Sequence, residues 1–267
     1  MKYIFENTPF PRTRQSIKTD LEALGVTSGM TILVHSSLSS IGWTNGGAVS
    51  VIQALMDVVT KEGTIVMPSQ SVDLSDPSEW KYPPVPEEWW KEIRDTMPPY
   101  HPDYTPVRGM GEIVEVFRTF PDVSRSSHPA YSFVAWGKNK SPILAQQSLT
   151  FGLGEQSPLA RLYELDSAVL FIGVGYDKNT CFHLAEYRAP SPPVITKGAP
   201  ILKNGQRIWK QYQELDFQEY HFEEIGRAFE QECSVTLGKI GSASSRLFSL
   251  KQAVDFAEQW VAAKDRE

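Results

Sequence analysis

Residues 30–69 read MTILVHSSLSSIGWTNGGAVSVIQALMDVVTKEGTIVMPS, and this stretch decides the fold class. The apolar runs at 30–37 and 63–69 are typical of buried strands. Between them, residues 46–59 have the apolar spacing of a helix, and Asn45 stands where its N-cap is expected. A strand, a helix and a second strand in succession indicate a sheet with helices packed on its faces.

The remainder of the chain extends this alternation. Apolar residues at helical spacing, a capping serine before a proline at 157–158, and uninterrupted apolar runs mark further elements. Helices are predicted at 14–24, 109–120, 157–165, 220–233 and from 251 onward, and strands at 132–137, 167–175 and 239–250. We therefore expect one α/β domain over residues 1–267, with a central mixed sheet between two layers of helices.

Two segments depart from this alternation of helices and strands. Residues 71–106 are crowded with prolines and aromatic side chains and contain one short predicted helix at 87–94. A connection of this length in a compact domain is usually a lid or a binding wall. Residues 191–215 contain the pair Asn204-Gly205, a strong hairpin-turn signal, and predict an appended β-meander.

Charge and composition exclude several classes of protein. The net charge of −6 disfavours nucleic acid as the main partner, because phosphate binding needs a basic face. No apolar stretch approaches the roughly 20 residues that span a bilayer, and the N-terminus lacks a signal-peptide run. Cys181 and Cys233 give no disulfide framework, which suits the reducing cytoplasm. A homodimer is the default expectation, because two-fold pairs are the commonest assembly.

The loop VHSSLSSIGWTNGG, residues 34–47, joins a predicted strand to a predicted helix. A helix N-terminus offers free backbone N–H groups that favour anions, and serine hydroxyls add further donors. The loop matches neither the dinucleotide-binding nor the P-loop fingerprint, so a polar loop that only caps its helix is the alternative. His35 ends the strand, at the edge where α/β proteins bind ligands.

A second polar segment, CFHLAEYRAP at residues 181–190, follows the predicted strand 167–175. On a helix, His183 and Glu186 share one face, and a carboxylate there fixes the tautomer of a histidine that acts as a base. The alternative is a histidine with a purely structural hydrogen bond. Cys181 points away from His183 on such a helix, which disfavours a cysteine–histidine nucleophile pair.

A metal site is not expected, although several potential ligands are present. The HxxE spacing is not the HExxH zinc motif, and any metal would need additional ligands such as His101 or His128. Arg108 and Arg125 could each hold a phosphate through a fork of donors, or each could be an ordinary surface arginine with an acidic neighbour.

Taken together, these motifs resemble the aminoglycoside 3-N-acetyltransferase family, whose fold differs from that of the GNAT acetyltransferases. The resemblance runs from about Arg12 to Gln259 and is close to members from Bacillus-type bacteria. It rests on VHSSLSSIGW followed by GG, GTIVMPSQS, PPYHPDYTPVRGMGE, RSSHPAYSFVAWG and LFIGVGYDKNTCFHLAE with the RAP after it.

The resemblance implies acetyl transfer from acetyl-CoA to the 3-amino group of a 2-deoxystreptamine ring. It places the catalytic histidine at His183 and its glutamate at Glu186. The residues implied to contact coenzyme A are His35, Ser36, Ser37, Leu38, Ser39, Ser40, Thr105, Arg108 and Met110.

Direct attack of the amine with His183 as general base is the mechanism we expect, since only a neutral amine attacks a thioester. Glu186 would either orient His183 or hold a substrate ammonium. Donors of the loop at residues 34–47, here called the serine loop, would stabilise the oxyanion. Acids that could bind a polycation are Asp73, Asp76, Glu79, Glu87, Glu88 and Asp103. Alternatives are acetylation of a different amine, a non-catalytic protein that binds coenzyme A, and a serine hydrolase, which the absence of a GxSxG motif disfavours.

Overall fold

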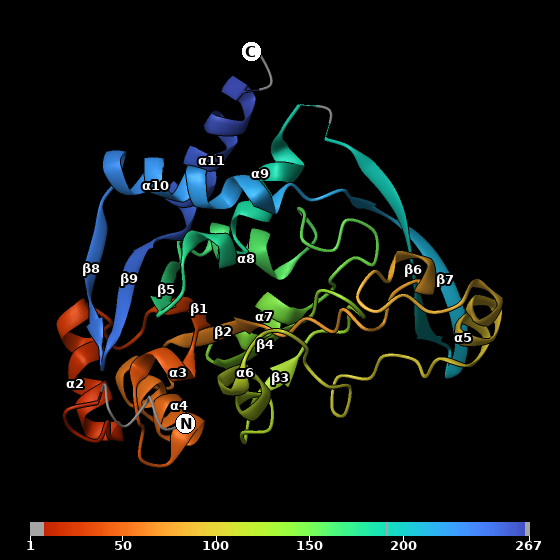
Figure 1. Ribbon diagram of the computed structural model, residues 1–267. Helices are drawn as coiled ribbons and strands as arrows, with labels where there is room; N and C mark the ends of the chain where they lie inside the picture. Colours follow the sequence, from red (N-terminus) through yellow and green to blue (C-terminus); the bar gives the residue numbers. More distant parts are fainter. Residues whose placement is uncertain (1–7, 191, 265–267) are drawn as a thin grey trace.

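The computed structural model describes residues 8–190 and 192–264 (Figure 1). Its centre is a seven-stranded sheet with the strand order β3-β4-β2-β1-β5-β9-β8. The strands of this sheet are β1 (Thr31–Ser36), β2 (Thr64–Pro68), β3 (Ser124–Arg125), β4 (Phe133–Gly137), β5 (Ala168–Ile172), β8 (Val235–Ile240) and β9 (Ala243–Ser249). β1 runs parallel to both of its neighbours, β2 and β5, while β4 and β9 are antiparallel to the strands beside them.

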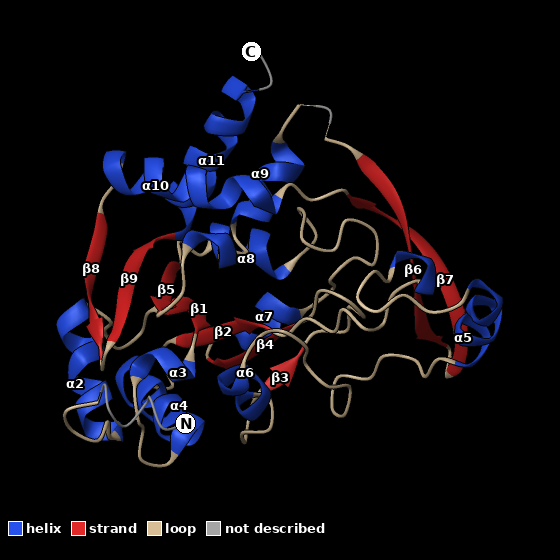
Figure 2. Cartoon of the chain, viewed as in Figure 1, coloured by secondary structure: helices blue, strands red, loops and turns tan. Residues whose placement is uncertain are grey.

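Helices cover both faces of the sheet (Figure 2). The α-helices are α2 (Arg14–Leu24), α3 (Leu38–Ile41), α4 (Gly47–Val59), α5 (Trp90–Thr96), α6 (Glu112–Phe117), α7 (Lys140–Leu144), α8 (Pro158–Glu164), α9 (Phe182–Arg188), α10 (Phe222–Glu232) and α11 (Leu250–Lys264). The described residues also contain the 3₁₀ turns η1 (Pro77–Glu79), η2 (Glu87–Trp89), η3 (Tyr176–Lys178) and η4 (Glu219–His221). The predicted α/β fold with a mixed central sheet is confirmed.

Side chains alternate along β1 between two separate cores, as the pleat of a strand requires. Ile32 and Val34 pack with α2, α4 and α6, whereas Leu33 packs with the helices α7 to α11. The His35 side chain points to the same side as that of Leu33. Its ring packs edge-to-face with Phe171, which belongs to the same core as Leu33, with 5.4 Å between the ring centroids. This alternation places His35 on the same side of the sheet as α9.

Helix ends show where local sequence decides the structure and where it does not. α2 begins after Thr13, which exchanges hydrogen bonds with Ser16 in a capping box, and it ends at the left-handed Gly25, as predicted. The predicted N-cap of α4, Asn45, is wrong. The cap is Gly46, whose φ of 79° is a left-handed conformation that glycine adopts without strain.

The predicted β-meander is a hairpin of two strands, β6 (Val194–Lys203) and β7 (Gln206–Leu215). Asn204 and Gly205 both have positive φ and form its turn, as their sequence predicts. The hairpin pairs with no strand of the seven-stranded sheet. Residue 191, where the predicted insertion starts, lies outside the described residues.

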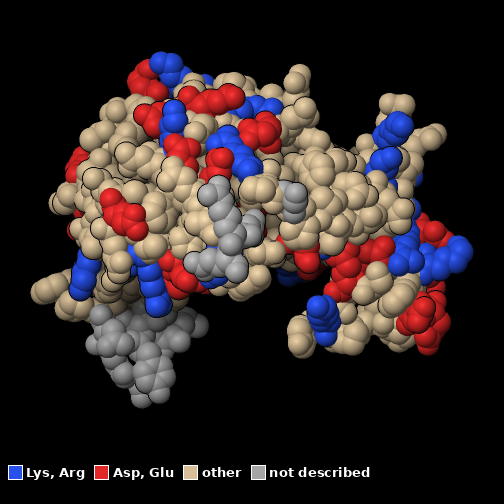
Figure 3. Space-filling view, turned by 90° about the horizontal axis from the view of Figure 1, so that it is seen from above, with Lys and Arg blue, Asp and Glu red and all other residues tan. Residues whose placement is uncertain are grey.

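The hairpin packs against the segment 71–106, which carries η1, η2 and α5 (Figure 1). Lys197 pairs with Glu79 at 2.5 Å, and the Arg207 guanidinium donates to the carbonyl of Met97 at 3.0 Å. Seen from above, this end of the molecule carries charged side chains of both signs (Figure 3). That this segment opens and closes as a lid, and that residues 1–267 form one domain, stay predictions.

One glycine in the core gives a test of the packing around β5. Gly226 in α10 lies against the buried ring of Tyr176, and a Cβ at this position would stand 1.9 Å from Tyr176 Cγ. We expect Gly226→Ala to lower the free energy of unfolding by about 2 kcal/mol, because overpacking outweighs the gain in helix propensity. Urea denaturation measures this, and Gln231→Ala on the exposed face of α10 is the control. An unchanged midpoint for Gly226→Ala would refute the packing described here.

Candidate active site

Two neighbouring parallel strands deliver the predicted functional segments to one edge of the sheet. β1 pairs with β5 in the register His35 to Phe171. After β1 the chain enters the serine loop and α3, and after β5 it passes through η3 into α9. Because parallel strands end at the same edge, segments almost 150 residues apart in the chain lie side by side there.

A cleft of about 400 Å³ opens at this edge. The serine loop forms one wall, and the chain leading into α6 together with Lys178 and Thr180, which precede α9, completes the lining. Thr180 lies in this wall, and its carbonyl accepts the backbone N–H of His183 at 3.2 Å. Of the residues predicted to bind coenzyme A, those that line the cleft are His35, Ser36, Ser37, Leu38, Ser39 and Met110.

Three residues predicted to bind coenzyme A lie outside the lining of this cleft. Ser40 donates its hydroxyl to Ser37 Oγ at 2.9 Å and so shapes the serine loop from behind. Thr105 is buried and accepts the backbone N–H of His101 at 2.8 Å. Arg108 is exposed and pairs with Asp73 at 2.7 Å, one residue before Gly109, which does line the cleft.

Two polar atoms of the cleft wall are buried without a hydrogen-bond partner in the described part of the chain, His35 Nε2 and Ser36 Oγ. Burying an unsatisfied polar atom costs about 1–3 kcal/mol, so such atoms call for an explanation. Burial, together with the charge on His183, lowers the pKa of His35 to about 3. A neutral imidazole carries one donor and one acceptor, and a ligand in the cleft would supply the missing partners.

His183 is held firmly by its surroundings. Only 4% of the residue is exposed. The rings of Phe217 and Phe222 pack against its imidazole, with centroid-to-centroid distances of 4.3 and 5.0 Å. Its Nδ1 lies 2.7 Å from Glu186 Oε2, one helical turn along α9. The other oxygen of Glu186 accepts the backbone N–H of Gln218 at 2.6 Å. Glu186 is thereby fixed on both sides and orients the imidazole.

A second carboxylate reaches the other ring nitrogen. Glu219, the first residue of η4, places Oε1 3.5 Å from His183 Nε2. Burial alone would lower the pKa of His183, but hydrogen bonds and charges from Glu186 and Glu219 outweigh burial and raise it to about 9. The contact with His183 in turn lowers the pKa of Glu219.

Comparison with known proteins supplies the family. Residues 33–262, most of the chain, match the family described as aminoglycoside 3-N-acetyltransferase. The chain belongs to this family. The predicted resemblance, and with it the enzyme class, is confirmed.

Individual members of the family match along the whole chain. The SPbeta prophage-derived aminoglycoside N(3')-acetyltransferase-like protein YokD of Bacillus subtilis (strain 168) is 64% identical, over 99% of this chain and 98% of its own. The crystal structure of YokD superposes with a TM-score of 0.99 at 63% identity, over 100% and 99% of the two chains. Aminoglycoside N(3)-acetyltransferase III of Pseudomonas aeruginosa is 31% identical, over 95% of both chains. A structure described as AAC-IIIb binary with CoASH has a TM-score of 0.84 at 30% identity, over 96% and 98%.

In this acetyltransferase fold the other reactive side chains near the site have structural partners. Cys181 is buried and donates its thiol to Asn179 Oδ1 at 3.1 Å, and burial raises the pKa of that thiol. The interpretation that Cys181 and His183 form no nucleophile pair agrees with this contact. His128 accepts the backbone N–H groups of Ala130 and Tyr131 on Nδ1, so it braces a loop.

Arg125 has neither of the two roles considered for it. Its guanidinium is partly buried and donates to the carbonyl of Ser69 at 2.7 Å and the hydroxyl of Ser71 at 2.7 Å. It also donates to the carbonyl of Thr105. Arg125 therefore links both ends of the segment 71–106 to β3. Because its N–H donors are used in these contacts, it neither binds a phosphate nor lies free on the surface.

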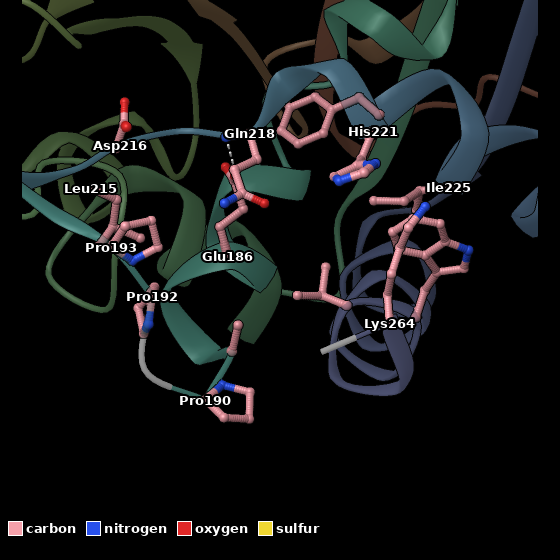
Figure 4. A pocket seen from close by; sticks show the side chains of 14 residues that line it. Glu186, Pro190, Pro192, Pro193, Leu215, Asp216, Gln218, His221, Ile225 and Lys264 are labelled. Atoms are coloured by element: carbon pink, nitrogen blue, oxygen red, sulfur yellow. Dashed lines mark hydrogen bonds between the residues drawn. The ribbon is translucent and has the colours of Figure 1, made fainter. Parts of the chain in front are cut away.

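Within residues 8–190 and 192–264, no group of three or more histidine, cysteine or acidic side chains is arranged to hold a metal ion. In the same ranges, no helix has the length and apolar character required to cross a membrane. A smaller pocket of about 100 Å³ reaches Glu186 from the side of α10 and α11 (Figure 4). Figure 4 shows Glu186 bonded to the backbone of Gln218 beside this pocket, with Lys264 at its far side.

Sequence reasoning missed Glu219. It lies 36 positions beyond His183, after the hairpin, and no motif spacing connects the two. The acids proposed for a polycationic substrate are partly neutralised, since Asp73, Asp76 and Glu79 pair with Arg108, Arg94 and Lys197.

Proposed function

We propose that the chain transfers the acetyl group of acetyl-CoA to the 3-amino group of the 2-deoxystreptamine ring of an aminoglycoside. The observation that carries this proposal is the imidazole of His183, which Glu186 contacts on α9, three residues after Thr180 in the cleft wall. Family membership and the names of its relatives support the reaction class. The proposed place of the reaction is the cytoplasm, where acetyl-CoA is available, and the homodimer stays a prediction.

Coenzyme A would bind in the cleft between the serine loop and the chain before α6. The AAC-IIIb structure, which is described with CoASH, supports this cosubstrate. The unpartnered His35 Nε2 and Ser36 Oγ fit a polar ligand at this place. When bound, acetyl-CoA supplies an acetyl group whose bond to sulfur is replaced by a bond to nitrogen, and the carrier leaves as a free thiol. Arg108 and Thr105 would act from outside the cleft lining, as supports or at the rim.

His183 is the proposed general base. With Glu186 accepting from Nδ1–H, the neutral ring has its free electron pair on Nε2. Nε2 then takes a proton from the attacking nitrogen, which is histidine's usual role near neutral pH. This geometry favours orientation of His183 as the role of Glu186, because both of its oxygens already have partners.

Hydroxyl donors of the serine loop would stabilise the negative charge on the acetyl oxygen. Ser37 and Ser39 line the cleft, and their hydroxyls lie 3.2 Å apart. Donors fixed in place before the reaction need no reorganisation as charge develops. His35, neutral and beside them, is a further donor for the bound thioester.

Release of free thiol from acetyl-CoA tests the proposal directly. We expect release only when acetyl-CoA and an aminoglycoside are both present, with the acetyl group found on the 3-amino nitrogen by NMR of the product. Release without any amine would show a hydrolase, and release with other amines only would show a different substrate. Binding of acetyl-CoA with no release under any condition would leave a non-catalytic binding protein and refute transfer.

A further inference from the structure

The Nε2 atom of His183 lies beside a second carboxylate, that of Glu219. Glu219 Oε1 lies 3.5 Å from Nε2, and the Glu219 side chain is 63% exposed while that of His183 is 5% exposed. The exposed Glu219 carboxylate is thus in contact with a nitrogen of the buried imidazole. An amine that approaches Nε2 also comes close to Glu219.

The ion pair of His183 with Glu219 opposes the role of His183 as a general base. Glu186 and Glu219 together raise the pKa of His183 to about 9, so the two carboxylates favour the imidazolium form. An imidazolium has no electron pair with which to take a proton from an amine. General-base catalysis by His183 is therefore helped by any change on substrate binding that weakens the contact between Glu219 and Nε2.

We propose that Glu219 is an exchangeable counter-ion, which pairs with His183 in the free chain and with the ammonium group of the amine substrate in the complex. This inference rests on the proposed function. An ammonium group at Glu219 replaces one positive charge by another at the same carboxylate. His183 then loses the contact that holds its Nε2 proton and faces a new positive charge, and both changes favour the neutral ring.

The other charged groups around His183 are not free to exchange. Glu186, on α9 itself, is fixed by His183 Nδ1 and the Gln218 backbone. Glu214, on β7, is buried and accepts from Tyr187 and two backbone N–H groups, and His35, on β1, is neutral. For Glu219 on η4, His183 is the only ion-pair partner among residues 8–190 and 192–264, with the charge of Lys178 nearby.

The protons balance over one turnover. Binding of the ammonium releases the Nε2 proton of His183 to solvent. His183 then takes one proton from the nitrogen, the nitrogen–carbon bond forms as the carbon–sulfur bond breaks, and the second nitrogen proton leaves on the thiol. The protonated His183 pairs again with Glu219 when the products depart. The net products are the N-acetyl compound, the free thiol and one proton.

NMR titration of the His183 ring in the ligand-free chain tests the counter-ion role without any reaction. We expect the His183 pKa to be lower in Glu219→Gln than in the parent chain. Glu224→Gln is the matched control, because Glu224 is exposed on α10 and pairs with Lys264 rather than His183. Glu224→Gln removes the same charge, and the pKa of His183 in this variant should equal that in the parent chain. A Glu219→Gln variant in which His183 titrates as in the parent overturns the inference.

Addition of the aminoglycoside sisomicin with unacetylated coenzyme A extends the test to the exchange. In the parent chain these ligands should lower the His183 pKa, and in Glu219→Gln they should lower it much less. In kinetics, the acidic limb of the kcat/KM profile should move to lower pH in Glu219→Gln, and KM for the amine should rise about fivefold, the worth of one exposed ion pair. An equal response of both chains to the ligands contradicts the exchange.

Failure of the proposed function has a different signature. If no amine is acetylated but Glu219→Gln lowers the pKa of His183 in the ligand-free chain, the counter-ion contact stands and the reaction is wrong. If amines are acetylated and the titrations of parent and variant coincide, the reaction stands and the role given to Glu219 is wrong.

Discussion

Replacing His183 by alanine is expected to lower kcat by about 10²–10⁴-fold, the usual contribution of a general base, while acetyl-CoA still binds. The reason is geometric, because His183 is the imidazole that Glu186 orients beside the cleft. Steady-state kinetics measures kcat, and calorimetric titration with acetyl-CoA measures binding. The residual rate should also lose the acidic limb that His183 gives to the pH profile.

Two further measurements separate chemistry from structural damage. Added imidazole should restore part of the rate of His183→Ala, because the variant leaves a space for a free base. His221→Ala is the control, since the His221 ring packs at a tilt against Tyr220 and Trp260, whereas the rings described against His183 are those of Phe217 and Phe222. Full activity of a folded His183→Ala variant would end the general-base mechanism.

Replacing Glu214 by alanine is expected to lower the free energy of unfolding by about 3–5 kcal/mol. The Glu214 carboxylate is fully buried, and it accepts the N–H groups of Gly152 and Leu215, each at 2.9 Å, and the hydroxyl of Tyr187. Alanine would leave all three donors buried without a partner. Chemical denaturation measures the loss.

Glu214→Gln is the matched variant, because it keeps the volume and one acceptor oxygen, and it should lose much less stability. Burial, the largest influence, raises the pKa of Glu214. A carboxyl with a raised pKa in the folded state contributes stability that is present at low pH and lost as pH rises through the folded pKa. This part of the pH dependence should vanish in Glu214→Gln. A Glu214→Ala variant as stable as the parent would show that the buried contacts are not formed.

Local patterns predicted the architecture well, for a physical reason. The strands at 30–37, 63–69 and 167–175 are buried on both faces, so they are continuous apolar runs that periodicity detects. The hairpin turn followed from Asn204-Gly205, because these two residue types adopt positive φ readily. The segment 239–250, predicted as one strand, instead contains the turn at Gly241 between β8 and β9.

The site was predictable only where its parts are close in the chain. His183 and Glu186 share one helix face, so their spacing was informative. Glu219, Glu214 and Arg125 act through contacts made by the tertiary fold. No local pattern singled out the two glutamates, and for Arg125 the sequence did not indicate the contacts that it makes. The family resemblance supplied the convergence of the serine loop with α9, which no local pattern encodes.

The independence of the β6–β7 hairpin from the main sheet has a consequence for how such a protein diversifies. None of its backbone ladder is shared with the seven strands that carry His35 and lead to His183. Insertions or deletions near Asn204 would change the tip of the hairpin without shifting the register of any strand of the seven-stranded sheet. A chimera with the hairpin tip of a distant relative should therefore keep the contact between His183 and Glu186 and the strands that lead to it.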